Sequence, residues 1–182
     1  MQRGFSLLEL LVAASIFLLL SGIALNLSRT ATERDELNAA AIGLVSWLEV
    51  VQKDAQRGIV GCRVTFSPGT KSSGSELANV EALDSPSTTS CQSKSNDPFR
   101  VGSEISSNPL TLEIIPENTP TSFVFTPRGT VSFVKDMIVT LRISDASLTR
   151  CVRISGTSGM VTIGAKKNDQ KKCTDASFRN PF

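Results

Sequence analysis

The chain opens with two apolar patterns that follow each other within its first 58 residues. Between Glu9 and Arg29 lie 19 uncharged residues, 10–28, in which Leu, Ile, Val, Ala and Phe predominate. A helix of this length covers roughly 28 Å, close to the ~30 Å hydrocarbon core of a bilayer. The segment therefore predicts a membrane-spanning helix.

From residue 37 onward the apolar residues recur at helical spacing. Steps of 4, 3, 4, 3 and 4 connect Leu37, Ala41, Leu44, Leu48, Val51 and Ala55. This spacing predicts one buried stripe, to which Trp47 belongs as a core anchor. Gly58 and Gly61 would end the helix. We therefore expect one long helix whose half 5–28 spans the membrane and whose half 29–58 is amphipathic and packs on the rest of the chain.

After Gly58 the apolar period changes from helical to two-residue alternation. Alternation of this kind predicts short strands of antiparallel sheet packed against the helix stripe. The predicted strands are residues 59–66, 110–115, 122–126, 130–134, 138–144, 151–155 and 160–163. A long helix on small antiparallel sheets is an α+β fold, with residues 59–182 as a β-rich head.

Residues 67–108 interrupt this alternation. The segment is rich in Ser, Thr, Gly, Pro and Asn and has few bulky apolar residues. Loops of this length in compact domains are usually functional or flexible, and low complexity favours a flexible surface. We therefore expect a flexible loop over 67–108.

Composition narrows the classes of function. A chain of 182 residues suffices for one domain and an appendage, and 40% hydrophobic residues with a net charge of +2 argue against wholesale disorder and against a polyanion-coating protein. The chain has no histidine, which excludes His-based triads, Cys–His dyads and most catalytic zinc sites. No Gly-x-Ser-x-Gly motif occurs either. We expect neither an enzyme nor a cofactor.

Residues 1–4 form a short basic segment directly before the apolar run. A secretory signal begins in the same way but ends at a small-x-small cleavage site. The candidate site at 39–41, three alanines, lies beyond the charged residues 33–36 and fits poorly. An uncleaved signal-anchor remains an alternative on composition alone.

Glu9 departs from both of these interpretations. An ionisable side chain in a membrane span costs a few kcal/mol and usually has a partner. A cut between Gly4 and Phe5 would create a cationic amine, on the same chain or on a neighbouring one, that offsets this cost. Glu9 would then lie in the first turn of the helix, where the helix dipole favours an anion.

Residues 4–10, Gly-Phe-Ser-Leu-Leu-Glu-Leu, resemble the class III signal of type IV prepilins and type II secretion pseudopilins. The resemblance implies that a prepilin peptidase cuts after Gly4, which removes a leader of residues 1–4, and methylates the new terminus Phe5. It also implies that Glu9 pairs with the terminus of a neighbouring subunit during filament assembly. The implied partners are the peptidase, other pilin or pseudopilin subunits and an inner-membrane assembly platform.

The same resemblance implies a single-pass protein of the bacterial inner membrane. Its head would lie in the periplasm and later in a periplasmic or cell-surface filament; Arg3 on the cytoplasmic flank agrees with the positive-inside tendency. A type IV pilus, a competence pilus and a type II secretion pseudopilus all remain open. So does a single-pass anchored protein in which Glu9 has no such role.

A second resemblance covers roughly residues 110–164. The segment 122–130, Ser-Phe-Val-Phe-Thr-Pro-Arg-Gly-Thr, resembles the Phe-x-Phe-x-Pro-x-Gly segment of the GspH/FimT group of minor pilins and pseudopilins. The hairpin formed by 151–155 and 159–163 is similar to the final strand pair of that group. This resemblance implies a long helix packed on two small β-sheets.

Four cysteines lie beyond the predicted span, on the side expected to be extracytoplasmic. An even number in an oxidising compartment suggests two disulfides, whereas zinc would favour a CxxC pair that is missing here. Of three connectivities we favour Cys62–Cys91 and Cys151–Cys173, because each ties an irregular segment to a strand. A closed loop of 20–30 residues contributes on the order of 3 kcal/mol in the chain-entropy model.

Charge is concentrated near the carboxyl end, in a predicted basic tail over 164–182. Residues 141–182 hold 8 basic and 3 acidic side chains, whereas residues 1–140 hold 11 and 14. A basic cluster can attract phosphate backbones, so DNA binding for uptake is an alternative function. The candidate residues are Arg150, Arg153, Lys166, Lys167, Lys171 and Lys172, with Arg179 contributing to the excess.

The resemblance speaks against this alternative. Some members of the GspH/FimT group take up DNA through a Gly-Arg-x-Arg motif at the final hairpin, and the matching residues 159–162 here, Gly-Met-Val-Thr, contain neither arginine. We prefer a solvated basic tail on a structural subunit, with DNA binding as the second hypothesis.

Overall fold

The fold is described from a computed structural model. The residues it describes are 7–58, 60–83, 91, 98–100, 110–115, 121–133, 135–143, 148–156, 158–166, 173 and 178, with only the backbone of 19–20, 22–30 and 113–115.

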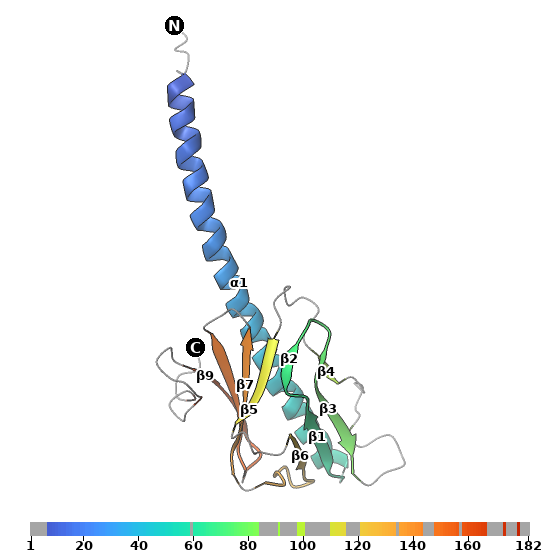
Figure 1. The fold of residues 1–182 in the computed structure, drawn as a ribbon. Helices are drawn as coiled ribbons and strands as arrows, with labels where there is room; N and C mark the ends of the chain where they lie inside the picture. Colours follow the sequence, from blue (N-terminus) through green and yellow to red (C-terminus); the bar gives the residue numbers. More distant parts are fainter. Residues whose placement is uncertain are drawn as a thin grey trace.

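One continuous helix, α1 (Leu7–Gly58), dominates the structure. Its second half lies along the head, while its first half extends away from it (Figure 1). The six residues of the predicted stripe, from Leu37 to Ala55, are all buried. The predicted helix on antiparallel sheets is therefore confirmed as an α+β fold.

The predicted span 10–28 includes positions 19–20 and 22–28, whose side chains lie outside the description. Among the described residues, none of the helices combines the length and the apolar character that crossing a membrane requires.

The first sheet has the order β4-β3-β1-β6 and is antiparallel throughout. Its strands are β1 (Cys62–Phe66), β3 (Glu76–Ala82), β4 (Phe99–Arg100) and β6 (Ser122–Phe125). In β1, residues 62, 64 and 66 are buried and alternate with two more exposed residues, which is the two-residue period of a strand with one face on the core.

The second sheet has the order β2-β5-β7-β8-β9 and is also antiparallel. Its strands are β2 (Gly69–Lys71), β5 (Leu110–Ile115), β7 (Met137–Ile143), β8 (Thr149–Ile154) and β9 (Val161–Ala165). Arg150 lies opposite Leu141, and Val152 lies opposite Val139, so these residues share one face of the sheet. This face meets α1, because Arg150 donates a hydrogen bond to a side chain of the helix.

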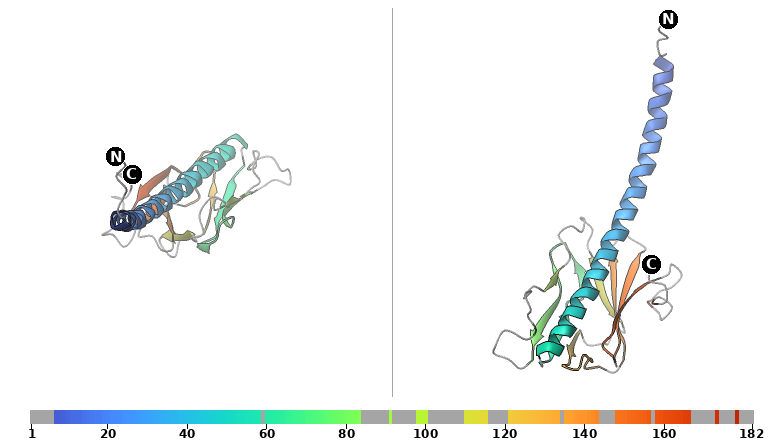
Figure 2. Two further views of the ribbon diagram at one scale, coloured as in Figure 1. Left: turned by 90° about the horizontal axis from the view of Figure 1, so that it is seen from above. Right: turned by 180° about the vertical axis from the view of Figure 1, so that it is seen from behind.

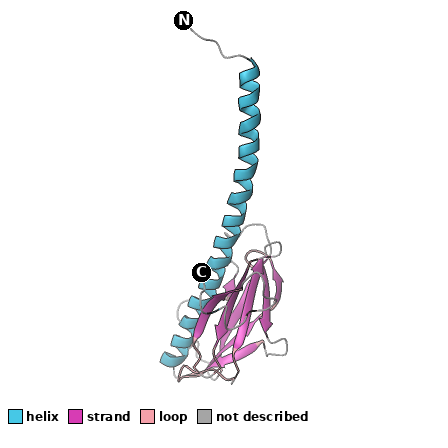
Figure 3. Ribbon diagram, turned by 90° about the vertical axis from the view of Figure 1, so that its left-hand side faces the viewer, coloured by secondary structure: helices cyan, strands magenta, loops and turns pink. Residues whose placement is uncertain are grey.

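The helix crosses both sheets, as the view from behind shows (Figure 2), and the strands all lie to one side of it (Figure 3). It contacts β7, β8 and β9 of the second sheet and β1 and β6 of the first. The stripe on α1 is therefore the layer that both sheets share.

Two predictions about the strands were wrong. The segment 67–108, predicted as a flexible loop, contributes β2, β3 and β4. The predicted strand 130–134 forms only a single bridge, Val131 opposite Phe125, among its described residues. The reason is that Ser132 accepts a hydrogen bond from the backbone of Val124 through its hydroxyl and donates its own N–H to the Val124 carbonyl, which caps the edge of β6 instead of extending the sheet.

Two turns meet α1 at the far end of the head. Gly129, in the turn after β6, and Gly159, in the β8–β9 turn, both have positive φ, 78° and 68°. The Gln52 side chain donates a hydrogen bond from Nε2 to the Gly129 carbonyl over 2.6 Å. A Cβ on Gly159 would collide with that same carbonyl oxygen, so the close approach of the two turns requires glycine here.

We expect Gly159→Ala to destabilise the head more than Gly74→Ala does. Gly74 also has positive φ, 78°, but a Cβ there meets nothing, so alanine costs only the backbone strain of about 1 kcal/mol. Gly159→Ala adds a collision with backbone, for a total of about 2–4 kcal/mol. The measurement is denaturant unfolding of the full chain, monitored through the fluorescence of its single tryptophan, Trp47. Equal losses in the two variants would contradict the close packing of these turns.

Candidate functional site

Glu9 lies in the first turn of α1, and its side chain is exposed. This is the position in a helix where the unpaired N–H groups and the helix dipole favour a carboxylate. The other two residues of the predicted processing site, Gly4 and Phe5, lie outside the described residues.

The helix around Glu9 presents apolar side chains on every side. The large ones that are exposed between residues 7 and 18 are Leu7, Leu8, Leu10, Leu11, Val12, Ile16, Phe17 and Leu18. Leu7 is 79% exposed and Phe17 is 72% exposed. A helix that is apolar all round is typical of an element surrounded by apolar material, and it is unfavourable in water.

Two serines in this half, Ser15 and Ser21, have their hydroxyl groups satisfied within the helix. Ser15 Oγ donates to the Val12 carbonyl and Ser21 Oγ donates to the Phe17 carbonyl, each over 2.8 Å. These bonds reduce the cost of burying a hydroxyl in an apolar environment, because the donor keeps a partner there.

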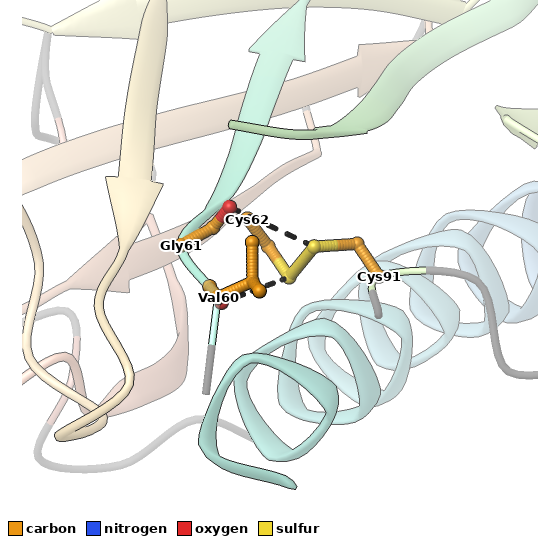
Figure 4. Close-up of a disulfide and its surroundings, with 4 residues drawn as sticks. All are labelled: Val60, Gly61, Cys62 and Cys91. Atoms are coloured by element: carbon orange, nitrogen blue, oxygen red, sulfur yellow. Dashed lines mark hydrogen bonds between the residues drawn. A yellow bond between two sulfur atoms is a disulfide. The ribbon is translucent and has the colours of Figure 1, made fainter. Parts of the chain in front are cut away.

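The structure contains the two disulfides in the connectivity that the sequence favours. Cys62, at the start of β1, is bonded to Cys91, with the Cα atoms 5.7 Å apart and the bridge beside the end of α1 (Figure 4). The Cys91 sulfur also lies 3.7 Å from the Gly61 carbonyl oxygen. The bond ties residue 91, between β3 and β4, to the core of the first sheet.

The second disulfide joins Cys151 in β8 to Cys173, with the Cα atoms 6.2 Å apart. Cys151 lies opposite Thr140 of β7, on the sheet face that points away from α1. The Thr140 hydroxyl lies 3.8 Å from the Cys173 sulfur, and the Phe178 ring lies 4.5 Å from the Arg153 guanidinium carbon. Residues 173 and 178 are therefore held on the outer face of the second sheet.

The structure separates Arg150 from Arg153, two of the basic residues that the sequence groups as a DNA-binding candidate. Arg150 lies on the inner face and bonds to Asn38 of α1, whereas Arg153 lies on the outer face, 4.0 Å from Asp136. Lys166 follows β9, and Lys167, Lys171, Lys172 and Arg179 lie outside the described residues. DNA binding through this region stays a prediction.

Asn38 and Gln52 are structural residues that sequence reasoning missed. Each holds a strand or a turn against α1 through one hydrogen bond, and neither belongs to the apolar stripe. Both side chains are partly buried, but neutral amides outside the apolar stripe of a helix are common, so the sequence offers no signal for them. Among the described residues, no group of three or more His, Cys, Asp or Glu could hold a metal ion.

Comparison with known families gives a match at the amino end. Residues 1–25 match the prokaryotic N-terminal methylation motif. The predicted resemblance to the prepilin signal is thereby confirmed. None of the curated protein sequences that were compared is significantly similar to the chain.

Two solved structures share the fold. One is the type IV minor pilin FimU of Pseudomonas aeruginosa, with a TM-score of 0.51 and 19% identity over 76% of this chain and 94% of that one. The other is the minor pseudopilin EpsH from the type 2 secretion system of Vibrio cholerae, with a TM-score of 0.51 and 12% identity over 71% of this chain and 97% of that one. At these identities the likeness shows the fold, and it confirms the pilin-like arrangement that the sequence predicts.

We expect removal of either disulfide to lower the free energy of unfolding by about 3 kcal/mol. The bonded residues are 29 and 22 positions apart, and the chain-entropy model gives nearly the same stabilisation for both loops. The variants are Cys62→Ala/Cys91→Ala and Cys151→Ala/Cys173→Ala, compared by denaturant unfolding of the full chain. Peptide mapping without reductant checks the pairing, and four free thiols in the unmodified chain would contradict it.

Proposed function

We propose that this chain is a membrane-anchored minor pilin or pseudopilin, processed at Gly4 and added to a filament. One observation supports this proposal above the others. The methylation motif over residues 1–25 overlaps the start of a 52-residue helix whose large apolar side chains between residues 7 and 18 are exposed and whose stripe from residue 37 is buried in the head. A helix with those two halves suits a subunit that is held first by lipid and later by other subunits.

In this proposal residues 10–28 cross the inner membrane before assembly. Their length matches the hydrocarbon core, and a continuous helix satisfies its own backbone hydrogen bonds in lipid. The side chains that are exposed between residues 7 and 18 would gain about 25 cal/mol for each Å² that lipid removes from water. The head would lie on the periplasmic side, where disulfides form and persist.

Processing by a prepilin peptidase would remove residues 1–4 and methylate the new amine of Phe5. A carboxylate within an apolar span costs a few kcal/mol unless it has a partner. Glu9 follows Phe5 by four residues in the sequence, and it would pair with the amine of a neighbouring subunit when the apolar halves pack together. Cleavage thereby provides the charge that makes the buried carboxylate favourable in the filament.

Two kinds of filament match this proposal equally. The fold is shared with a type IV minor pilin and with a type 2 secretion pseudopilin, and both are structural subunits by name. The genes beside the coding sequence distinguish them: secretion-channel genes indicate a pseudopilus, whereas twitching or DNA-uptake genes indicate a type IV or competence pilus.

We expect Gly4→Val to block processing in a host with an active prepilin peptidase. A branched side chain at the cleavage position would leave residues 1–4 attached and Phe5 without its methyl group. Intact-mass spectrometry of the membrane fraction measures both changes at once. Filaments assembled from the unmodified chain with Met1 still present would contradict the proposal.

We expect Glu9→Ala to leave membrane insertion and processing intact but to lower incorporation into filaments about tenfold or more. The reason is that the amine of the neighbouring subunit loses the Glu9 carboxylate as its ion-pair partner. Glu49→Ala is the matched control, since Glu49 is an exposed glutamate on the other half of the same helix. Immunoblotting of sheared filaments against membranes measures incorporation. Equal incorporation of the two variants would contradict the role of Glu9.

A further inference from the structure

Three basic residues lie at the end of the head from which the free half of α1 emerges. Arg34 is exposed on α1, one turn before Asn38, where the buried part of the helix begins. Arg150, near the start of β8, donates a hydrogen bond from Nε to Asn38 Oδ1 over 2.5 Å. Lys166 joins this end because its backbone N–H donates to the Thr149 carbonyl, next to Arg150. We name Arg34, Arg150 and Lys166 the proximal rim.

The charge of Arg150 is not neutralised by the bond that holds it. Its partner Asn38 is a neutral amide, and no carboxylate among the described residues forms an ion pair with Arg150. Partial burial and the nearby positive charge of Arg34 lower the pKa of Arg150. An arginine nevertheless remains protonated at physiological pH, so two like charges persist side by side. Such a pair is stabilised by an anion.

Three acidic residues, Glu33, Asp35 and Glu36, lie on the same stretch of α1. Glu33 and Glu36 each take part in an interaction of their own. Asp35 is exposed and lies about 60° around the helix from Asn38, on the opposite side of Asn38 from Arg34. Asn38 is only about 40° from Arg34, which places Arg34 on the side of the helix that faces Arg150.

We propose that the proximal rim binds the anionic phospholipid headgroups of the leaflet from which α1 emerges, and so holds the head against the membrane before assembly. This inference rests on the proposed membrane anchor. The position of the rim supports it, because Arg34 follows the end of the predicted span by six residues, or about 9 Å of helix. The headgroup layer is about 5–7 Å deep, and a long arginine side chain reaches back toward it.

The same position favours lipid over nucleic acid. In an anchored subunit this end of the head faces the bilayer, where DNA has the least access. Each basic side chain close to an anionic leaflet strengthens binding to it about fivefold. This attraction falls off within a Debye length. The contact would therefore be weak enough to release when the subunit leaves the membrane.

The test uses the full chain in lipid nanodiscs made of phosphatidylcholine alone or with 30% phosphatidylglycerol. Each disc carries a trace lipid with a photoreactive headgroup, and cross-linked peptides are quantified after chymotrypsin digestion, which the arginine variants do not alter. The variants are Arg34→Glu and the matched control Arg128→Glu, an exposed arginine in the turn at the opposite end of the head. We expect cross-links on residues 31–38 and 149–151 that increase with phosphatidylglycerol and weaken at high salt.

Arg34→Glu should lower these cross-links by about fivefold or more, because it removes one positive charge and adds a negative one, whereas Arg128→Glu should leave them unchanged. Equal cross-link yields in both variants would overturn the inference while leaving the anchor in place. So would cross-link yields that do not change with phosphatidylglycerol content or with salt. A chain that does not co-purify with the discs would overturn the anchor and this inference together. A mobility shift with duplex DNA in neutral discs that Arg34→Glu abolishes would assign the rim to nucleic acid instead.

Discussion

The structure depends on one buried stripe of the helix α1. The stripe supplies the apolar surface that both sheets share, since α1 contacts strands of each. Side chains such as Leu44, Leu48 and Ala55 are fully buried there, together with Val139 and Leu141 of β7. An open sheet cannot bury its own apolar face and needs another element packed on it, so losing the stripe would expose the inner faces of both sheets at once.

Polar contacts near each end of the packed half fix how the helix lies on the head. Arg150 bonds to Asn38 at the proximal end, and Gln52 bonds to the Gly129 carbonyl at the far end. An apolar stripe alone permits sliding and rotation, because dispersion contacts have little directional preference. Two hydrogen bonds about 14 residues apart along α1 restrict both movements, and one of them is accepted by the carbonyl of Gly129, a glycine with positive φ.

Much of this fold could be predicted from the sequence, because long periodic segments carry strong signals. The stripe on α1, the strands β5 to β9 and both disulfides follow from periodicity and cysteine position. Strand β3 had a signal too: Ala78, Val80 and Ala82 alternate with polar residues and lie opposite β1. The polar composition of 67–108 concealed it, while β2 and β4 are too short to show any period.

The placement of the basic residues was less predictable, because the order of charges along a sequence does not show on which face of a sheet each side chain lies. Arg150 and Arg153 are three residues apart in β8, an odd separation that places them on opposite faces of the sheet. The first contacts the helix, and the second lies with Asp136 and Phe178 on the outer face. A patch that would bind a phosphate backbone needs its cations on one surface. The two arginines of β8 therefore lie on different surfaces, and each must be interpreted from its own neighbours.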